Sequence, residues 1–143
     1  MKNKTKFEWG YNFQINDRKE FDVRRGGRTE IPAIDLLLKT HTLIGSLTGI
    51  QHNNWNFELG INGVLQDNFS DPNTGIKRLM PDYIKYEAGF YVVGNYQKNN
   101  SFIWEWGLRI DQILIDAKKY YDFADWEERN YSALFSYFKM QKT

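Results

Sequence analysis

The chain has 143 residues, which is room for one domain with a sizeable core. Its 19 Lys and Arg against 18 Asp and Glu give a net charge of +1, which offers no support for a nucleic-acid partner. The absence of cysteine excludes disulfides and thiolate metal sites. No apolar run approaches the roughly 18 residues of a transmembrane helix. The basic start, Met1–Lys6, lacks the apolar run of a signal peptide, so we expect no export signal.

The first half of the chain is patterned as strands, in which successive side chains point to opposite faces. Residues 5–16 are the clearest case, because five large apolar side chains alternate with polar ones or glycine. Residues 36–50 are rich in Thr and branched residues, which indicates a strand, but their alternation is blurred and leaves their faces open. A short polar turn at 51–54 leads into 55–66, which alternate again.

The second half contains a long hairpin. Residues 86–97 and 101–115 alternate on either side of the polar link 98–100, a pattern that predicts a tight turn between antiparallel strands. Tyr91 and Val93 break the alternation by standing on the polar side. Residues 131–140 are predicted to form a further strand.

The connections alternate between long and short. Long ones are expected at 17–35, at 67–83 and from 116 to 143, and short ones at 51–54 and 98–100. Antiparallel neighbours place such connections at two unlike edges. The predicted fold is therefore all-β, an antiparallel up-and-down meander of five to six long strands with every long connection at one edge.

Strand length and aromatic placement favour a transmembrane β-barrel. Residues 55–66 would extend about 40 Å at ~3.4 Å each, or roughly 28 Å when tilted, close to the ~25 Å apolar band of outer-membrane barrels. Aromatic residues gather beside the short turns, as in an interfacial girdle. The polar side chains expected to face a lumen are Glu8, Glu58, Glu87, Glu105, Arg109 and Asp111. Alternation alone favours a soluble sheet with one buried face, and strand length, the order of the connections and the aromatic placement together reverse that preference.

Several stretches carry a family resemblance. They are Arg24–Leu36, Thr40–Thr42, Gln66–Phe69, Arg78–Tyr83, Gly107–Asp111 and Asp125–Arg129. Together they are similar to segments of TonB-dependent outer-membrane receptors, most closely those of the Bacteroidetes type. The resemblance implies a barrel of about 22 strands, plugged by an N-terminal domain. Such a receptor imports iron–siderophores, haem, cobalamin or similar nutrients with energy supplied through TonB.

Five or six strands are fewer than the roughly 8 of the smallest closed barrels. We therefore expect residues 1–143 to be a single segment of the receptor's β-barrel, without its plug domain or signal peptide. The resemblance implies no enzyme activity and no cofactor, and a location in the outer membrane of a Gram-negative cell. The implied partners are membrane lipid, the rest of the barrel, an unidentified small-molecule substrate and, through the parent protein, the plug and TonB.

Candidate ligand-binding residues lie in the expected long connections. Arg24, Arg25 and Arg28, beside two glycines, could grip a carboxylate or phosphate of a substrate, since guanidinium groups bind such anions bidentately. The alternative is a solvated loop in which they pair with nearby carboxylates. Trp126 could stack on a ligand or pack against neighbouring loops.

No metal site or catalytic motif is predicted. His41 and His52 have no carboxylate at ligand spacing, and Asp71–Gly75 has the spacing of a turn rather than of a calcium loop.

Two other classes of function stay open for the chain. One is a soluble small β-barrel or sandwich that binds an apolar ligand, with Trp104 and Trp106 lining its core or pocket. The other is an interaction module that uses an exposed sheet edge.

Overall fold

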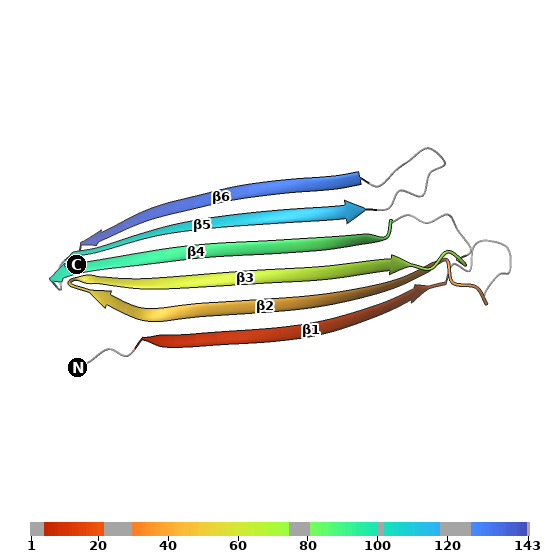
Figure 1. Ribbon diagram of the computed structural model, residues 1–143, viewed down its shortest axis with the longest axis horizontal. Helices are drawn as coiled ribbons and strands as arrows, with labels where there is room; N and C mark the ends of the chain where they lie inside the picture. The colour runs from red at the N-terminus through yellow and green to blue at the C-terminus, as the bar shows by residue number, and fades with distance from the viewer. Residues whose placement is uncertain (1–4, 22–29, 75–80, 100–101, 118–126, 143) are drawn as a thin grey trace.

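The fold is a single antiparallel sheet (Figure 1), seen here in a computed structural model. The structure describes residues 5–21, 30–74, 81–99, 102–117 and 127–142. The strands are β1 (Lys6–Glu20), β2 (Ile34–His52), β3 (Trp55–Ser70), β4 (Tyr83–Asn99), β5 (Phe102–Ala117) and β6 (Glu127–Lys142). Each pairs with the next in the order β1-β2-β3-β4-β5-β6. The predicted all-β up-and-down meander is confirmed.

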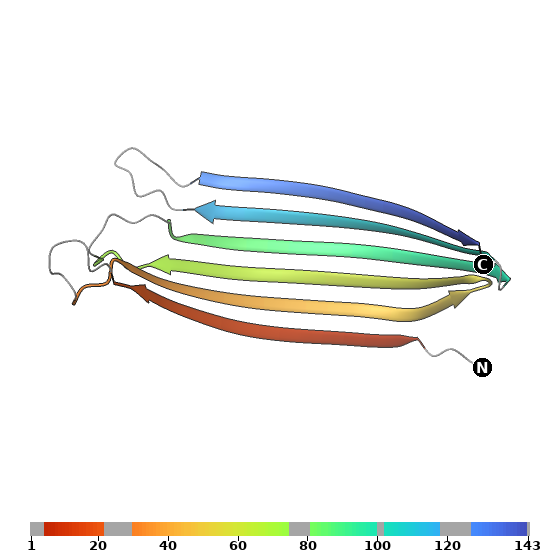
Figure 2. The same ribbon diagram turned by 180° about the vertical axis from the view of Figure 1, so that it is seen from behind.

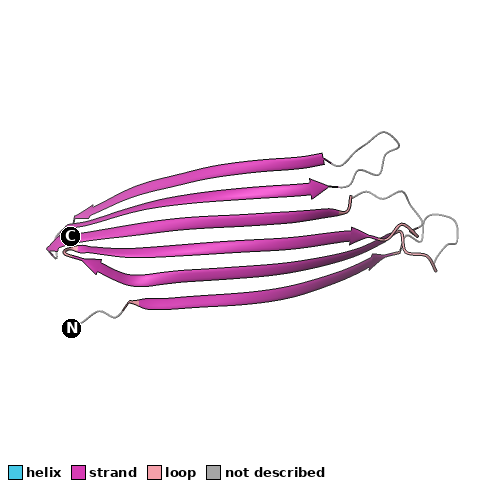
Figure 3. Cartoon of the chain, viewed as in Figure 1, coloured by secondary structure: helices cyan, strands magenta, loops and turns pink. Residues whose placement is uncertain are grey.

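The strands are 15 to 19 residues long and pair over nearly their full lengths. Their ends form two unlike edges, which we call the loop edge and the turn edge. Pairs such as Glu20 with Ile34 and Ala117 with Glu127 mark the loop edge, and His52 with Trp55 marks the turn edge. Figure 3 shows strands throughout the described chain, joined at these two edges. None of the described residues belongs to a helix that could cross a bilayer.

All three predicted long connections are shorter than expected, because residues 17–20, 67–70 and 127–142 belong to strands. Residues 17–20 continue β1 and pair with 34–37 of β2. Lys19 forms an ion pair with Asp35 of β2 (3.2 Å), and Arg18 forms one with Glu20 of its own strand. The prediction that 116–143 all lie at the long-connection edge was wrong. β6 returns along the whole of β5 to the turn edge, beyond the strand predicted at 131–140. β6 carries aromatic residues on both faces, so alternation did not reveal its extent.

Residues paired in register share a face and form a row across the sheet, so the pairing defines two faces. The apolar face carries the alternating large side chains, such as Trp9, Ile61 and Phe90, and the polar face carries Glu58 and Arg109. All six residues predicted to face a lumen share the polar face. So do Tyr91 and Val93, the two exceptions in the sequence pattern.

A β-bulge explains the blurred alternation of 36–50. The register between β2 and β3 shifts between Leu47 and Ile50, so that both side chains stand on the apolar face. Gly49, within the bulge, has a φ of 73°, a left-handed conformation that glycine adopts without steric cost.

The sheet has no second layer among the described residues, and none of their apolar side chains is buried. Figure 2, the view from behind, shows the same single layer. The most exposed large side chains include Trp9 (70%), Leu134 (68%) and Phe138 (65%). The two buried polar residues, Asn68 and Ser70, lie at the loop edge, and the other buried residues of the described chain are glycines within the strands. Asn68 donates to the Pro81 carbonyl (3.0 Å), and the Ser70 backbone N–H donates to Asp82 (2.7 Å).

Candidate functional site

The predicted ligand-binding residues Arg24, Arg25, Arg28 and Trp126 lie outside the described residues, so their role stays a prediction. At the base of their connections, the described chain holds ion pairs of its own. Lys19 lies near the end of β1, at the loop edge. Its hydrogen bond to Asp35 raises the pKa of the Lys19 ammonium group.

The turn end of the apolar face is lined by stacked aromatic rings. Trp55 contacts Tyr96 (ring centroids 4.9 Å apart), Tyr96 contacts Trp104 (6.0 Å), and Trp104 contacts Phe138 (6.1 Å). This chain of rings crosses β3 to β6 without a break. The predicted gathering of aromatic residues beside the short turns is confirmed.

The loop end of the same face is charged. Lys39, Asp67 and Asp116 belong to one row, joined through Ile84. Between this row and the aromatic rings lie mainly apolar rows, such as Leu47–Leu59–Val92–Leu108. On the β5–β6 side these rows also hold a polar group, in which Gln112 hydrogen-bonds Asn130 and Ser132. From Asp67 back to Trp55 the strand extends about 40 Å, or roughly 28 Å when tilted by ~45°. The apolar face is thus a band with an aromatic border and a charged border.

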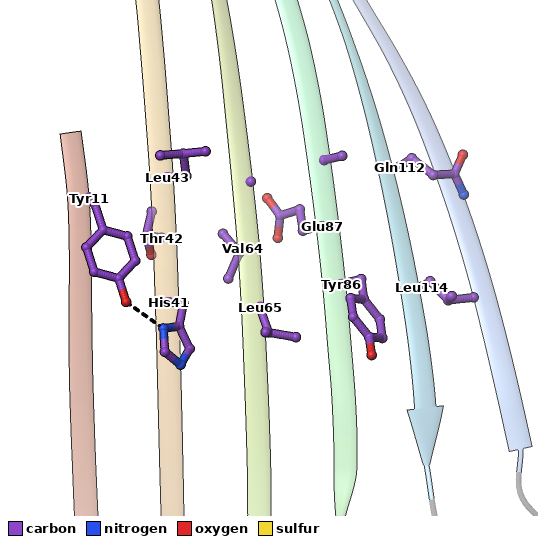
Figure 4. A pocket seen from close by; sticks show the side chains of 12 residues that line it. Tyr11, His41, Thr42, Leu43, Val64, Leu65, Tyr86, Glu87, Gln112 and Leu114 are labelled. Atoms are coloured by element: carbon purple, nitrogen blue, oxygen red, sulfur yellow. Dashed lines mark hydrogen bonds between the residues drawn. The ribbon is translucent and has the colours of Figure 1, made fainter. Parts of the chain in front are cut away.

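A hollow of about 420 Å³ lies in the apolar face near its charged border (Figure 4). Its floor is Gly63 and Ala88, which share a row, and larger side chains such as Leu65 and Tyr86 surround them. Tyr11 and His41 close one side through a hydrogen bond of 2.7 Å between the hydroxyl and Nδ1. The hollow is open and mostly apolar.

The centre of the polar face is a hydrogen-bonded network that joins β5 to β3 across β4. Arg109 donates from Nε and Nη2 to the two carboxylate oxygens of Asp111 (2.7 Å each), and from Nη2 to the side-chain oxygen of Asn62 (3.0 Å). Asn62 and Asp111 lie directly over Gly89 of β4, where a Cβ atom would clash with both. The bidentate pair fixes the guanidinium group and compensates its charge.

Two tyrosines lie flat over glycines of neighbouring strands. Tyr91 covers Gly60 and donates its hydroxyl to Glu58 (2.8 Å). Tyr137 covers Gly107, and Glu105 lies near its hydroxyl group. In each case the ring occupies the space that a Cβ atom on the glycine would need. The sequence marked Tyr91 only as an exception to the alternation, and its pairing with a glycine across the strand was the signal that could have identified it.

The network continues toward the loop edge. Tyr83 donates to Gln66 (2.9 Å), which donates to Thr40 (3.1 Å), and Lys85 pairs with Glu87 (3.0 Å). No group of His and carboxylate side chains suited to a metal ion is found within the part of the chain that the structure describes. His41 and His52 both belong to β2, but His41 lies near the middle of the strand and His52 is its last residue. The side chains of the polar face can donate and accept hydrogen bonds and can stack on aromatic rings. Those that the structure describes include no nucleophile paired with a base.

Comparison with known proteins adds no relative. The chain matches no family model, no curated protein and no solved structure.

Proposed function

We propose that this chain is a segment of the wall of an outer-membrane β-barrel of the TonB-dependent receptor type. The observation that carries the proposal is the layout of the two faces. One is an exposed apolar band between aromatic rings and a charged row, and the other is a polar, hydrogen-bonded surface. A barrel wall in a bilayer presents its apolar band to lipid and its polar face to the lumen.

The exposed band supports a lipid environment over water. Soluble monomers rarely expose contiguous apolar patches beyond about 300–600 Å², whereas here the band crosses β1 to β6. In lipid these side chains need no second layer, and the strands can be as long as the bilayer requires. The aromatic rings at the turn edge then lie at the membrane interface, where amphipathic rings are favoured.

The two outer strands support a larger assembly. β1 and β6 each pair on one side only among the described strands, which leaves two rows of backbone N–H and C=O groups without strand partners. Within a bilayer such groups must be satisfied by neighbouring strands. The rest of the receptor barrel would supply those strands.

The receptor-level function follows from the sequence resemblance. The parent protein would import nutrients such as iron–siderophores, haem or cobalamin, with a plug domain in the lumen and energy from TonB. The loop edge would face the outside of the cell, and the turn edge the periplasm, because outer-membrane barrels have long extracellular loops and short periplasmic turns. Arg24, Arg25, Arg28 and Trp126 would then meet incoming substrate.

Tryptophan quenching tests the membrane assignment. Trp9, Trp55, Trp104 and Trp106 all belong to the apolar face, and W126F removes the remaining tryptophan. In vesicles whose acyl chains carry bromine, we expect the fluorescence of the W126F chain to be strongly quenched and to resist aqueous acrylamide. A chain that is monomeric without detergent and shields its tryptophans from acrylamide would instead support the soluble sandwich or small barrel.

A further inference from the structure

The hollow over Gly63 and Ala88 is a defined depression in the apolar face (Figure 4). A Cβ atom on Gly63 would meet only the Glu87 carbonyl oxygen, at 3.8 Å, so the space above the floor is open. Leucine side chains and the Tyr86 ring stand around a volume of about 420 Å³ that is lined almost entirely by apolar surface. In a bilayer such a depression is filled, because an empty apolar cavity forfeits the dispersion contacts of the atoms that line it.

The hollow lies close to the charged border of the apolar face. Gly63 and Asp67 stand on the same face of β3, and the Leu65 row is the one row between theirs. The two residues are about 14 Å apart along the strand, or roughly 10 Å in height at a tilt of ~45°. A lipid with its headgroup at the charged row would therefore place the upper part of an acyl chain over the hollow.

The side chains of the charged row have no ion-pair partners of their own. Lys39, Asp67 and Asp116 form no ion pair with any residue that the structure describes. Lys39 and Asp67 are direct neighbours across β2 and β3, and Asp116 lies two strands beyond Asp67. The row thus offers one ammonium group to a phosphate and two carboxylates to a cation. A purely anionic headgroup would meet more negative charge than positive charge here.

We propose that this part of the apolar face binds one lipid whose headgroup carries a phosphate and a free ammonium group, with an acyl chain in the hollow. The phosphate lies at Lys39, and the ammonium group donates hydrogen bonds to Asp67 or Asp116. Such bonds between charged groups are stronger than neutral ones, and a quaternary ammonium group cannot form them. The inference rests on the proposed barrel wall, because it requires lipid at this face, and it names the lipid that the face recognises.

Competition between headgroups tests the proposal. The full chain in detergent micelles is mixed with equal amounts of phosphatidylethanolamine, phosphatidylglycerol and phosphatidylcholine that carry identical acyl chains. Native mass spectrometry then identifies and counts the lipids that stay bound. We expect one phosphatidylethanolamine per chain, retained at least roughly threefold more than either other lipid. Equal retention of the three lipids, or a preference for one of the other two, would overturn the proposal.

Two matched pairs of variants locate the site. D67N should lower the preference for phosphatidylethanolamine over phosphatidylglycerol by roughly threefold, whereas E8Q should leave it unchanged, because Glu8 lies on the polar face and pairs with Lys6 at 2.7 Å. A88L fills the floor of the hollow and should lower the retention of lipid, whereas V92L, on the same strand and face but outside the hollow, should not. Equal effects within either pair would overturn the assignment. The headgroup comparison on the unaltered chain decides the matter where a variant does not fold.

The result is separable from the membrane assignment. Quenching of the W126F chain by brominated acyl chains reports lipid contact over the whole apolar face, whatever the headgroup. Strong quenching without any headgroup preference would leave the barrel wall supported and overturn the lipid site. A chain that shows neither quenching nor bound lipid would overturn both proposals.

Discussion

On the polar face, the Tyr91 ring lies over Gly60, which has no side chain to block it. The Tyr91 ring fills the space over Gly60, and its hydroxyl reaches Glu58 on the far side of that glycine. Gly89 and Gly107 make the same kind of room for Asn62 and Tyr137. Three neighbouring strands thus each contribute one glycine, and the polar side chains lie flat rather than standing upright.

Replacing Gly60 by alanine tests this arrangement. The new Cβ would displace the Tyr91 ring and break its 2.8 Å hydrogen bond to Glu58. We expect G60A to lower the free energy of unfolding by about 1–3 kcal/mol, measured by urea titration in detergent micelles.

The matched control is G63A on the same strand. A Cβ there would meet only the Glu87 carbonyl oxygen, at an ordinary 3.8 Å. Alanine is the better residue in a strand where space allows, so G63A should be neutral or slightly stabilising. Equal losses in the two variants would mean that the flat tyrosine is not what requires Gly60.

Among the elements, β2 and β6 show where sequence patterning fails. The first strand was predicted over 5–16 and extends to Glu20, and both hairpin strands were predicted to within three residues of their ends, because most large apolar side chains keep to one face in each strand. β2 changes phase at the bulge between Leu47 and Ile50, so no single alternation describes it. In β6, Phe135 and Tyr137 stand on the polar face and Leu134 and Phe138 on the apolar face, which hides the period of two.

The candidate sites divide in the same way. The polar residues at alternating positions were assigned to one face from the sequence, because their spacing fixes their side. The positions of Tyr91 and Tyr137 over glycines of neighbouring strands were not predicted. They depend on which residues pair across the strands, and single-strand patterns do not contain that register.

The bulge in β2 gives a prediction at the scale of the element. Gly49 has a φ of 73°, so a side chain there is strained, whereas its neighbour Thr48 has no such requirement. We expect G49A to cost about 1 kcal/mol of unfolding free energy, measured by urea titration, and T48A to cost less than half of that. If G49A were neutral, the bulge would not need a left-handed residue, and the phase change of β2 would have another cause.

At the scale of the whole molecule, the two faces demand different surroundings. The apolar face has an aromatic border at the turn edge and a charged border at the row of Lys39, Asp67 and Asp116. The polar face carries its network from Thr40 to Arg109. A sheet with these two faces is stable where lipid meets one and water or protein meets the other.

A scan of spin labels along β3 tests this arrangement in full. The chain has no cysteine, so each position from 59 to 67 can carry a single labelled cysteine. In vesicles, odd positions such as Ile61 and Leu65 should be accessible to oxygen, which concentrates in lipid, because they belong to the apolar face. Even positions such as Asn62 and Gln66 should show little contact with oxygen, and the alternation should end at the charged row, at Asp67. In a soluble sandwich the odd positions would form a core and be shielded from oxygen and from water-soluble nickel complexes alike, and that result would remove the support for a barrel wall.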